Sequence, residues 1–276
     1  MNPILIAFLL SLIAGMGTGL GGLIAVIRKP GPRLYGFLMG MTAGVMITLS
    51  FLDLVNQAWE LSGFLTATIG FGVGAIFMLI LDVTIPHIRF GEEEIPHSEE
   101  ASTPMEVNAQ RLGRRRFGQL RHAGSIDRGL LNSGILIAIG ITIHNIPEGI
   151  AVGAGYMHTP SFGIFIAVAI LLHNIPEGIA TALPLCTSGI CRWDSFRVAF
   201  LSGLAEPLGA LAAALFLTSF QSLIPATLAF AGGVMVFITL DELIPAAREH
   251  GHHHSTAIGI IVGAIFVFLL TGLFKI

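Results

Sequence analysis

Long runs of apolar residues, separated by short polar stretches, set the pattern of this chain. A membrane-spanning helix needs about 20 predominantly apolar residues, and eight segments meet this condition. They cover residues 3–27, 34–56, 62–86, 130–156, 161–186, 196–219, 223–247 and 256–275. Because a helix satisfies its own backbone hydrogen bonds in lipid, the pattern predicts an all-α polytopic membrane protein with eight transmembrane helices.

One polar stretch is much longer than the others. Residues 87–129 contain "GEEEIPHSEE" and then "RLGRRRFGQLR", with almost no apolar periodicity. Such a composition is typical of a mobile loop. We therefore expect a single membrane domain, in which this loop joins helices 1–3 (residues 1–86) to helices 4–8 (residues 130–276).

The basic residues predict the orientation of the helices. All but one of the 14 Lys and Arg residues lie in or beside the stretches that follow the first, third, fifth and seventh spans, and the exception is Lys275. Lys and Arg are enriched in cytoplasmic loops of membrane proteins. We therefore expect the long loop in the cytoplasm and both termini on the extracellular or periplasmic side. The expected location is the cell membrane, which in a bacterium is the cytoplasmic membrane.

Composition agrees with this class of protein. Of the 276 residues, 54% are hydrophobic and 11% are charged, whereas a soluble domain carries about 25% charged residues. The 34 glycines suit helices that approach closely within a membrane. We expect the lipid bilayer as a partner and no nucleic acid.

One polar motif occurs twice inside the apolar segments. "HNIPEGIA" begins at His144 and again at His173. Residues four apart share one face of a helix, so His144 and Glu148 project together, as do His173 and Glu177. The fourth and fifth spans are antiparallel neighbours and carry the motif at similar depth. Folding them together brings two imidazoles and two carboxylates into one small volume.

Further polar residues extend this set. Asn145 and Asn174 flank the glutamates, and Glu206 lies near the middle of the sixth span. An acidic group at the centre of a membrane helix costs roughly 2.5–3.5 kcal/mol, so these carboxylates should face a cavity or a cation. Imidazole with carboxylate favours Zn²⁺, Fe²⁺, Mn²⁺ or Co²⁺ over Ca²⁺ and Mg²⁺. We predict one or two divalent metal ions, no organic cofactor, and as metal ligands His144, Asn145, Glu148, His173, Asn174, Glu177 and Glu206.

Polar residues elsewhere are weaker candidates. Asp53 on the second span, and Asp241 and Glu242 on the seventh, could line the path of an ion, although ordinary polar helix ends give the same pattern. Four histidines follow the seventh span and could collect metal on the cytoplasmic side, with a solvated His-rich loop as the alternative. They are His250, His252, His253 and His254.

The paired HNIPEG motifs and the order of the spans resemble the ZIP (Zrt/Irt-like) family of divalent metal transporters, in particular its bacterial, GufA-like branch. This resemblance covers the whole chain. It implies a 3+2+3 bundle with an inverted repeat, a two-metal centre at the ligands named above, and a homodimer. It also implies that spans one, four, five and six move against the others. Some members have Asp where this chain has Asn174, so occupancy by a second ion stays open.

We therefore expect a transporter rather than an enzyme, moving Zn²⁺, and with it Fe²⁺, Mn²⁺, Co²⁺ or Cd²⁺, into the cytoplasm by alternating access. Two alternatives stay open. An intramembrane metal-dependent hydrolase would use the same residues to activate water, although the chain has no HExxH motif. A metal sensor would bind ions without moving them.

Overall fold

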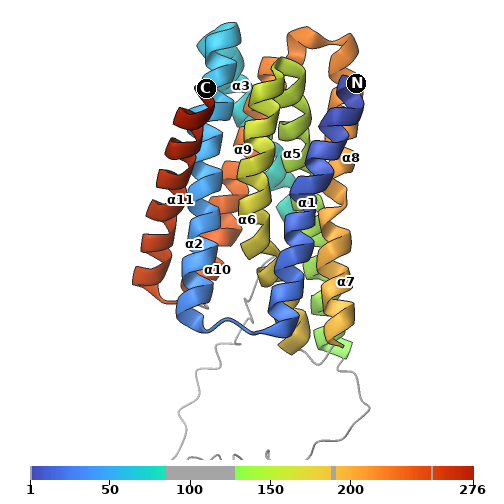
Figure 1. The fold of residues 1–276 in the computed structure, drawn as a ribbon, viewed down its shortest axis with the longest axis vertical. Helices are drawn as coiled ribbons and strands as arrows, with labels where there is room; N and C mark the ends of the chain where they lie inside the picture. Colours follow the sequence, from blue (N-terminus) through green and yellow to red (C-terminus); the bar gives the residue numbers. More distant parts are fainter. Residues whose placement is uncertain (1, 85–127, 188–190, 250) are drawn as a thin grey trace, which may run out of the picture.

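The computed structural model describes residues 2–84, 128–187, 191–249 and 251–276, and the regular secondary structure in these ranges is helical throughout. The helices stand side by side along the long axis of a bundle, and the two ends of the chain lie toward the same end of it (Figure 1). The long loop predicted for residues 87–129 lies outside the described residues as far as residue 127.

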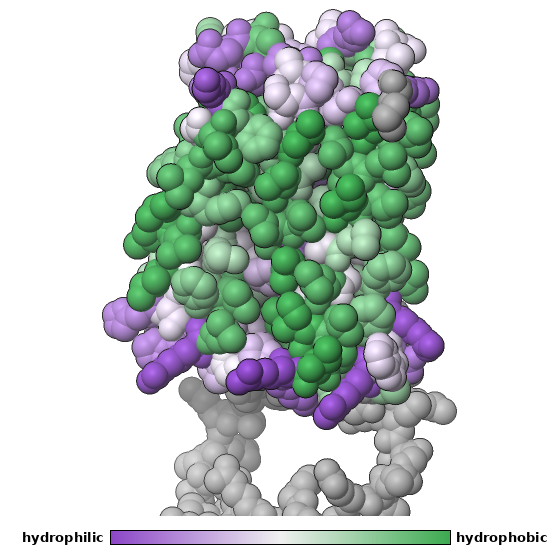
Figure 2. All heavy atoms as spheres, viewed as in Figure 1, coloured by the Kyte–Doolittle hydropathy of each residue, from purple (hydrophilic) through white to green (hydrophobic). Residues whose placement is uncertain are grey.

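Six helical stretches within the described residues are long and apolar enough to cross a membrane. An apolar band covers the middle of the bundle on the face shown in Figure 2, with hydrophilic residues toward both ends. The prediction of a helical, multi-pass membrane protein is confirmed, whereas the count of eight spans stays a prediction. The six stretches are Pro3–Ile27, Pro32–Thr84, Pro160–Cys186, Arg192–Ser219, Gln221–Glu249 and His253–Phe274.

The first helices show how local sequence sets helix ends. Helix α1 (Pro3–Ile27) begins with a proline, and the Asn2 side chain accepts a hydrogen bond from the Ile4 N–H at 3.0 Å. This is an N-cap, which satisfies one free donor of the first turn. Helix α2 (Pro32–Thr48) also begins with a proline and continues into a π-helical turn, η1 (Leu49–Val55).

The break between the predicted second and third spans lies later than the sequence indicated. Helix α3 (Asn56–Thr84) follows η1 directly, and its interruption is at Gly63, where φ is 80° and ψ is 169°. Glycine adopts such a positive φ readily. The preceding residues include Ala58, Glu60 and Leu61, which are good helix formers, so the helix runs on past the predicted end at residue 56.

The two copies of the motif lie on consecutive helices. They are α5 (Arg128–His158) and α6 (Pro160–Thr187), with only Thr159 between them. The predicted sixth span is divided at Leu204 into α7 (Arg192–Gly203) and α8 (Ala205–Ser219). Pro207 has no N–H to donate to the carbonyl four residues earlier, which accounts for the division.

A second π-helical turn interrupts the predicted seventh span. This turn, η3 (Thr239–Leu243), precedes the short helix α10 (Ile244–Glu249). Turns of this kind are rare and are frequently found at functional sites. The remaining elements in chain order are η2 (Gln221–Leu223), α9 (Ile224–Ile238), η3 (Thr239–Leu243), α10 (Ile244–Glu249) and α11 (His253–Phe274).

Packing divides the helices into two groups. In the first group α1 packs against α6 and α7, and α5 packs against α8; in the second group α2 packs against α11, and α3 packs against α9. Glycines bring backbones close within the first group. A Cβ added to Gly149 would collide with the backbone carbonyl of Glu206, and one added to Gly178 with that of Thr18. The glycine of each motif thus allows a close approach between two helices.

Candidate metal centre

The two motifs meet inside the bundle. The imidazole Nε2 of His173 on α6 lies 2.9 Å from Oε1 of Glu148 on α5, and neither side chain is exposed. One ligand atom from each of Glu148, His173 and Glu177 lies within 4.8 Å of the other two. Two carboxylates and an imidazole therefore converge at a spacing that one metal ion could bridge.

His144 is placed differently from His173. Its Nδ1 lies 3.9 Å from Oε2 of Glu242, which belongs to the π-helical turn η3. His144 also lines a cavity of about 10 Å³ between the convergent group and α2. The residues around this cavity are Tyr35, Met39, His144, Glu177, Ala180, Glu242, Leu243 and Ala246.

The two asparagines are fixed by backbone and side-chain acceptors. Asn145 Nδ2 donates to the Ser202 carbonyl at 2.9 Å. Asn174 Nδ2 donates to the Ala14 carbonyl at 3.0 Å and to Oε2 of Glu206 at 2.7 Å. Because a carbonyl oxygen can only accept, each amide must turn its nitrogen toward that partner. Both amide oxygens are then buried without a partner among the described residues.

Glu206 lies beside the centre rather than within the convergent group. Its side chain is fully buried on α8, where Oε1 accepts a hydrogen bond from the Ser11 hydroxyl at 3.2 Å and Oε2 accepts from Asn174. Both carboxylate oxygens thus have donors from the protein. The structure connects Glu206 to the motifs through Asn174, and this third carboxylate stays a predicted ligand.

Several buried polar atoms in the centre have no hydrogen-bond partner among the described residues. An unsatisfied buried polar group costs about 1–3 kcal/mol, and more if it is charged. A bound cation could satisfy several of these atoms at once. These atoms are His144 Nε2, Glu148 Oε2, His173 Nδ1, both Glu177 carboxylate oxygens and Glu242 Oε1.

Glu242 lies closer to the centre than its position in the sequence indicated. Sequence reasoning placed it with Asp53 and Asp241 as a residue of the ion path, yet it is only 5% exposed and lies next to His144. Asp241, its neighbour in the chain, is exposed. Asp53 is buried on η1 and accepts a hydrogen bond from Thr271. Both adjacent acids lie within η3, and the sequence alone does not indicate which of the two faces the interior of the bundle.

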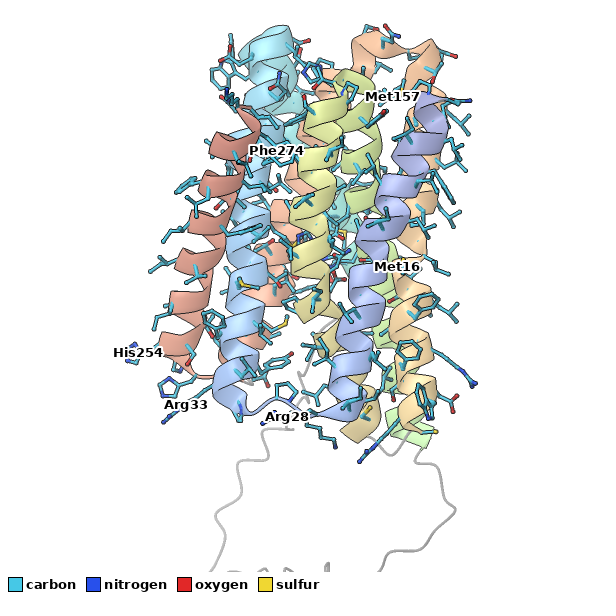
Figure 3. The ribbon with its side chains drawn as sticks, viewed as in Figure 1. Met16, Arg28, Arg33, Met157, His254 and Phe274 are labelled. Carbon is cyan, nitrogen blue, oxygen red and sulfur yellow. The ribbon has the colours of Figure 1, made fainter. Side chains whose placement is uncertain are left out.

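The His-rich segment lies at the start of α11. His252, His253 and His254 are exposed, and the rings of His252 and His254 have centroids 5.8 Å apart. His250 lies outside the described residues. Figure 3 shows His254 at the same end of the bundle as Arg28 and Arg33, with Phe274 toward the opposite end.

Comparison with known proteins assigns the chain to a family. Residues 74–271 match the ZIP zinc transporter family. The zinc transporter ZupT of Oceanobacillus iheyensis is 39% identical over 274 residues, which are 95% of this chain and 96% of that protein. The zinc transporter ZupT of Akkermansia muciniphila is 38% identical over 282 residues, covering 98% of this chain and 97% of the relative. The similarity thus includes both motifs and extends over nearly the full length, and the chain belongs to the ZIP family.

Proposed function

We propose that this protein carries a divalent transition metal ion, most readily Zn²⁺, across a membrane into the cytoplasm. The observation that carries the proposal is the convergence of Glu148, His173 and Glu177 within 4.8 Å of one another in the interior of the bundle. Zn²⁺ binds imidazole nitrogen and carboxylate oxygen at about 2.0–2.2 Å, so ligand atoms at this spacing need only small shifts to share an ion. Fe²⁺, Mn²⁺, Co²⁺ and Cd²⁺ are further expected substrates.

The ligand set supports one ion, with room for a second to be bridged. Glu148 and Glu177 each offer an oxygen without a protein partner. A neutral His173 ring that donates from Nε2 to Glu148 keeps a lone pair on Nδ1 for a metal. We propose the amide oxygens of Asn145 and Asn174, with Glu206, as further ligands. Asn174 adds no charge, which favours single occupancy.

Two observations support the proposed direction of transport, which are the position of the cavity and the location of the basic residues. The cavity extends from Glu177 and His144 to Tyr35 and Ala246, toward the end of the bundle at which Arg33 lies (Figure 3). By the enrichment of basic residues on the cytoplasmic side, this end faces the cytoplasm and both termini face outside. We propose alternating access, in which the first group of helices moves against the second.

Location and assembly are proposed on the same basis. We propose the cell membrane as the location, with one membrane domain and the segment 87–129 on the cytoplasmic side; the bacterial ZupT relatives support this location. A homodimer, as the family resemblance implies, is the proposed assembly. The comparisons give no support to a metal-dependent hydrolase, and a sensor has no need of the cavity that leads away from the centre.

Metal uptake into proteoliposomes tests the function directly. Wild-type protein should take up Zn²⁺ well above empty vesicles, and Glu177→Ala should lower the rate at least about a hundredfold, because it removes two unpaired carboxylate oxygens from the centre. Thr181→Val is the matched control. Thr181 is buried one turn further on and donates only to the Glu177 backbone, so its loss should leave the rate within about twofold.

Two results would refute the proposal. Wild-type vesicles that take up no more Zn²⁺ than empty ones would exclude transport. Uptake by folded Glu177→Ala at the rate of Thr181→Val would exclude the centre as the route. Folding of each variant is checked by its elution as a single species in detergent.

A further inference from the structure

Helix α1 borders the metal centre although its sequence contains no ionisable side chain. It packs against α6, α7 and α8 (Figure 1). A Cβ added to Gly15 would collide with the backbone carbonyl of Gly203, and one added to Gly17 with that of Leu171. The backbone of α1 therefore lies directly against the helix with the second motif and against the junction of α7 with α8, where Glu206 is found.

Ser11 connects α1 to the centre through its side chain. This residue is fully buried, and its hydroxyl donates a hydrogen bond to Oε1 of Glu206 at 3.2 Å. Ala14, three residues further along α1, accepts a hydrogen bond at its carbonyl from Asn174 Nδ2 at 3.0 Å. Two contacts from neighbouring positions on α1 thus hold one polar residue of α8 and one of α6.

The Asn174 amide is fixed by the same set of hydrogen bonds. A side-chain amide has two N–H donors and an oxygen that only accepts. The Asn174 nitrogen donates to the Ala14 carbonyl and, at 2.7 Å, to Oε2 of Glu206. Its oxygen, Oδ1, is buried and has no hydrogen-bond partner among the described residues. Both donors of the amide are therefore used, and its oxygen remains available to a cation.

Glu206 links Ser11 to Asn174, because each of its carboxylate oxygens accepts a hydrogen bond from one of them. These two bonds together fix the rotation of the carboxylate. Without the Ser11 hydroxyl, Oε1 would be buried without a donor, which is unfavourable for a charged group. The carboxylate would then turn toward another partner, and the Asn174 amide would lose one of its two acceptors. The hydroxyl prevents this without bringing a positive charge near the metal ion.

We propose that Ser11 is a positioning residue of the metal centre: its hydroxyl holds Glu206, and Glu206 holds the Asn174 amide with its oxygen free for the transported ion. The inference rests on the transport function proposed above, and it adds α1 to the helices that shape the site. Hydrogen-bond partners behind metal ligands orient those ligands, and their loss weakens metal binding by about ten- to a hundredfold. The competing explanation is that Ser11 only stabilises the packing of α1 on α8.

Zn²⁺ binding to purified protein in detergent, measured by equilibrium dialysis, separates the two explanations. Ser11→Ala should raise the Kd for Zn²⁺ at least about tenfold. Ser195→Ala is the matched control, since Ser195 is also buried and donates to the backbone carbonyl of Cys191, four residues earlier. Its Kd should stay within about twofold of wild type. A purely structural role would lower the unfolding temperature of Ser11→Ala in EDTA and leave its Kd equal to that of Ser195→Ala, which would overturn the proposal.

A double variant tests whether Ser11 acts through Glu206. In Glu206→Ala protein the Ser11 hydroxyl has no carboxylate to hold, so adding Ser11→Ala should change the Kd by no more than about twofold. A further rise as large as the one that Ser11→Ala causes in wild-type protein would overturn the proposal. If Glu206→Ala does not elute as a single species, the comparison of Ser11→Ala with Ser195→Ala decides by itself.

Uptake of Zn²⁺ by wild-type protein in proteoliposomes separates this inference from the transport function. Absence of wild-type uptake, with the difference in Kd between Ser11→Ala and Ser195→Ala present, refutes the transport function alone. Wild-type uptake together with equal Kd values in these two variants refutes the role of Ser11 alone.

Discussion

At the scale of single residues, the contact between Glu148 and His173 links the two copies of the motif. His173 meets a carboxylate of the neighbouring copy at 2.9 Å, whereas His144 approaches Glu242 on η3 at 3.9 Å. The two histidines therefore belong to different surroundings. Replacing either one removes an imidazole, but only His173 belongs to the group that converges on Glu148 and Glu177.

The Asn174 amide donates hydrogen bonds to two acceptors. A variant with a negative charge at this position should therefore be less stable without metal. Asn174→Asp should lower the thermal unfolding temperature in a chelator, because a carboxylate would face the Ala14 carbonyl and Glu206 without a donor, at a cost of about 1–3 kcal/mol. Added Zn²⁺ should raise that temperature more than in wild-type protein, since ligand binding stabilises the folded state. Thermal scans with EDTA and with Zn²⁺ measure both effects. A variant as stable as wild type in EDTA would contradict the assigned hydrogen bonds.

Much of the centre could be predicted from sequence because its signal is local. His173 and Glu177 are four residues apart, and the repeated motif on adjacent helices indicated that two such faces meet. The partner of His144 could not be predicted, because Glu242 comes from a distant segment and its neighbour Asp241 is equally acidic. The donors that hold Glu206 also come from other helices, so their contacts depend on the packing of the bundle.

At the scale of helices, the lengths of the apolar segments predicted where the first helix lies. They did not predict the irregular turns inside the later helices. The predicted first span coincides with α1. By contrast, the division at Leu204 and the turns η1 and η3 lie inside the predicted sixth, second and seventh spans. A π-helical turn changes the hydrogen-bond partner by one residue and leaves composition unchanged. The later break at Gly63 has a similar cause, since a run of good helix formers precedes it.

The close approach of helices at the motif glycines gives a prediction at this scale. Gly149→Ala should destabilise the protein by about 1–3 kcal/mol and lower Zn²⁺ uptake, because the added Cβ would press α5 away from α8 beside the metal ligands. Gly72→Ala on α3 is the matched control, since a Cβ there meets no atom within 4 Å. Thermal unfolding in detergent compares the two. A Gly149→Ala protein as stable as Gly72→Ala would contradict the packing of α5 on α8.

At the scale of the whole molecule, the two ends of the bundle differ in charge. Arg28, Arg33 and His254 lie at one end, and Phe274 and Met157 lie toward the other (Figure 3). The cavity beside Glu242 extends toward the basic end. The proposed direction of transport therefore depends on which end faces the cytoplasm, and this orientation can be measured separately from transport.

The free cysteines make the measurement simple. Cys191 is exposed at the start of α7. In a Cys186→Ser background, a membrane-impermeant thiol reagent should label Cys191 in inside-out vesicles and leave it unlabelled in intact cells. Ser219→Cys, placed at the end of α8 in protein without the native cysteines, should show the opposite pattern. Labelling of Cys191 in intact cells would reverse the proposed orientation.

The narrow cavity beside Glu177 has a consequence for hydrated ions. Its volume is about 10 Å³, which is enough for roughly one water molecule, so an ion passing it must give up most of its hydration shell. Imidazole and carboxylate replace the lost water around Zn²⁺, whereas Mg²⁺ sheds water reluctantly and needs near-ideal octahedral oxygen ligands. A roughly thousandfold excess of Mg²⁺ should accordingly leave Zn²⁺ uptake unchanged within about twofold, and strong competition would mean that the passage opens wide enough for a fully hydrated ion. The dehydration step thereby filters ions without any group that repels them.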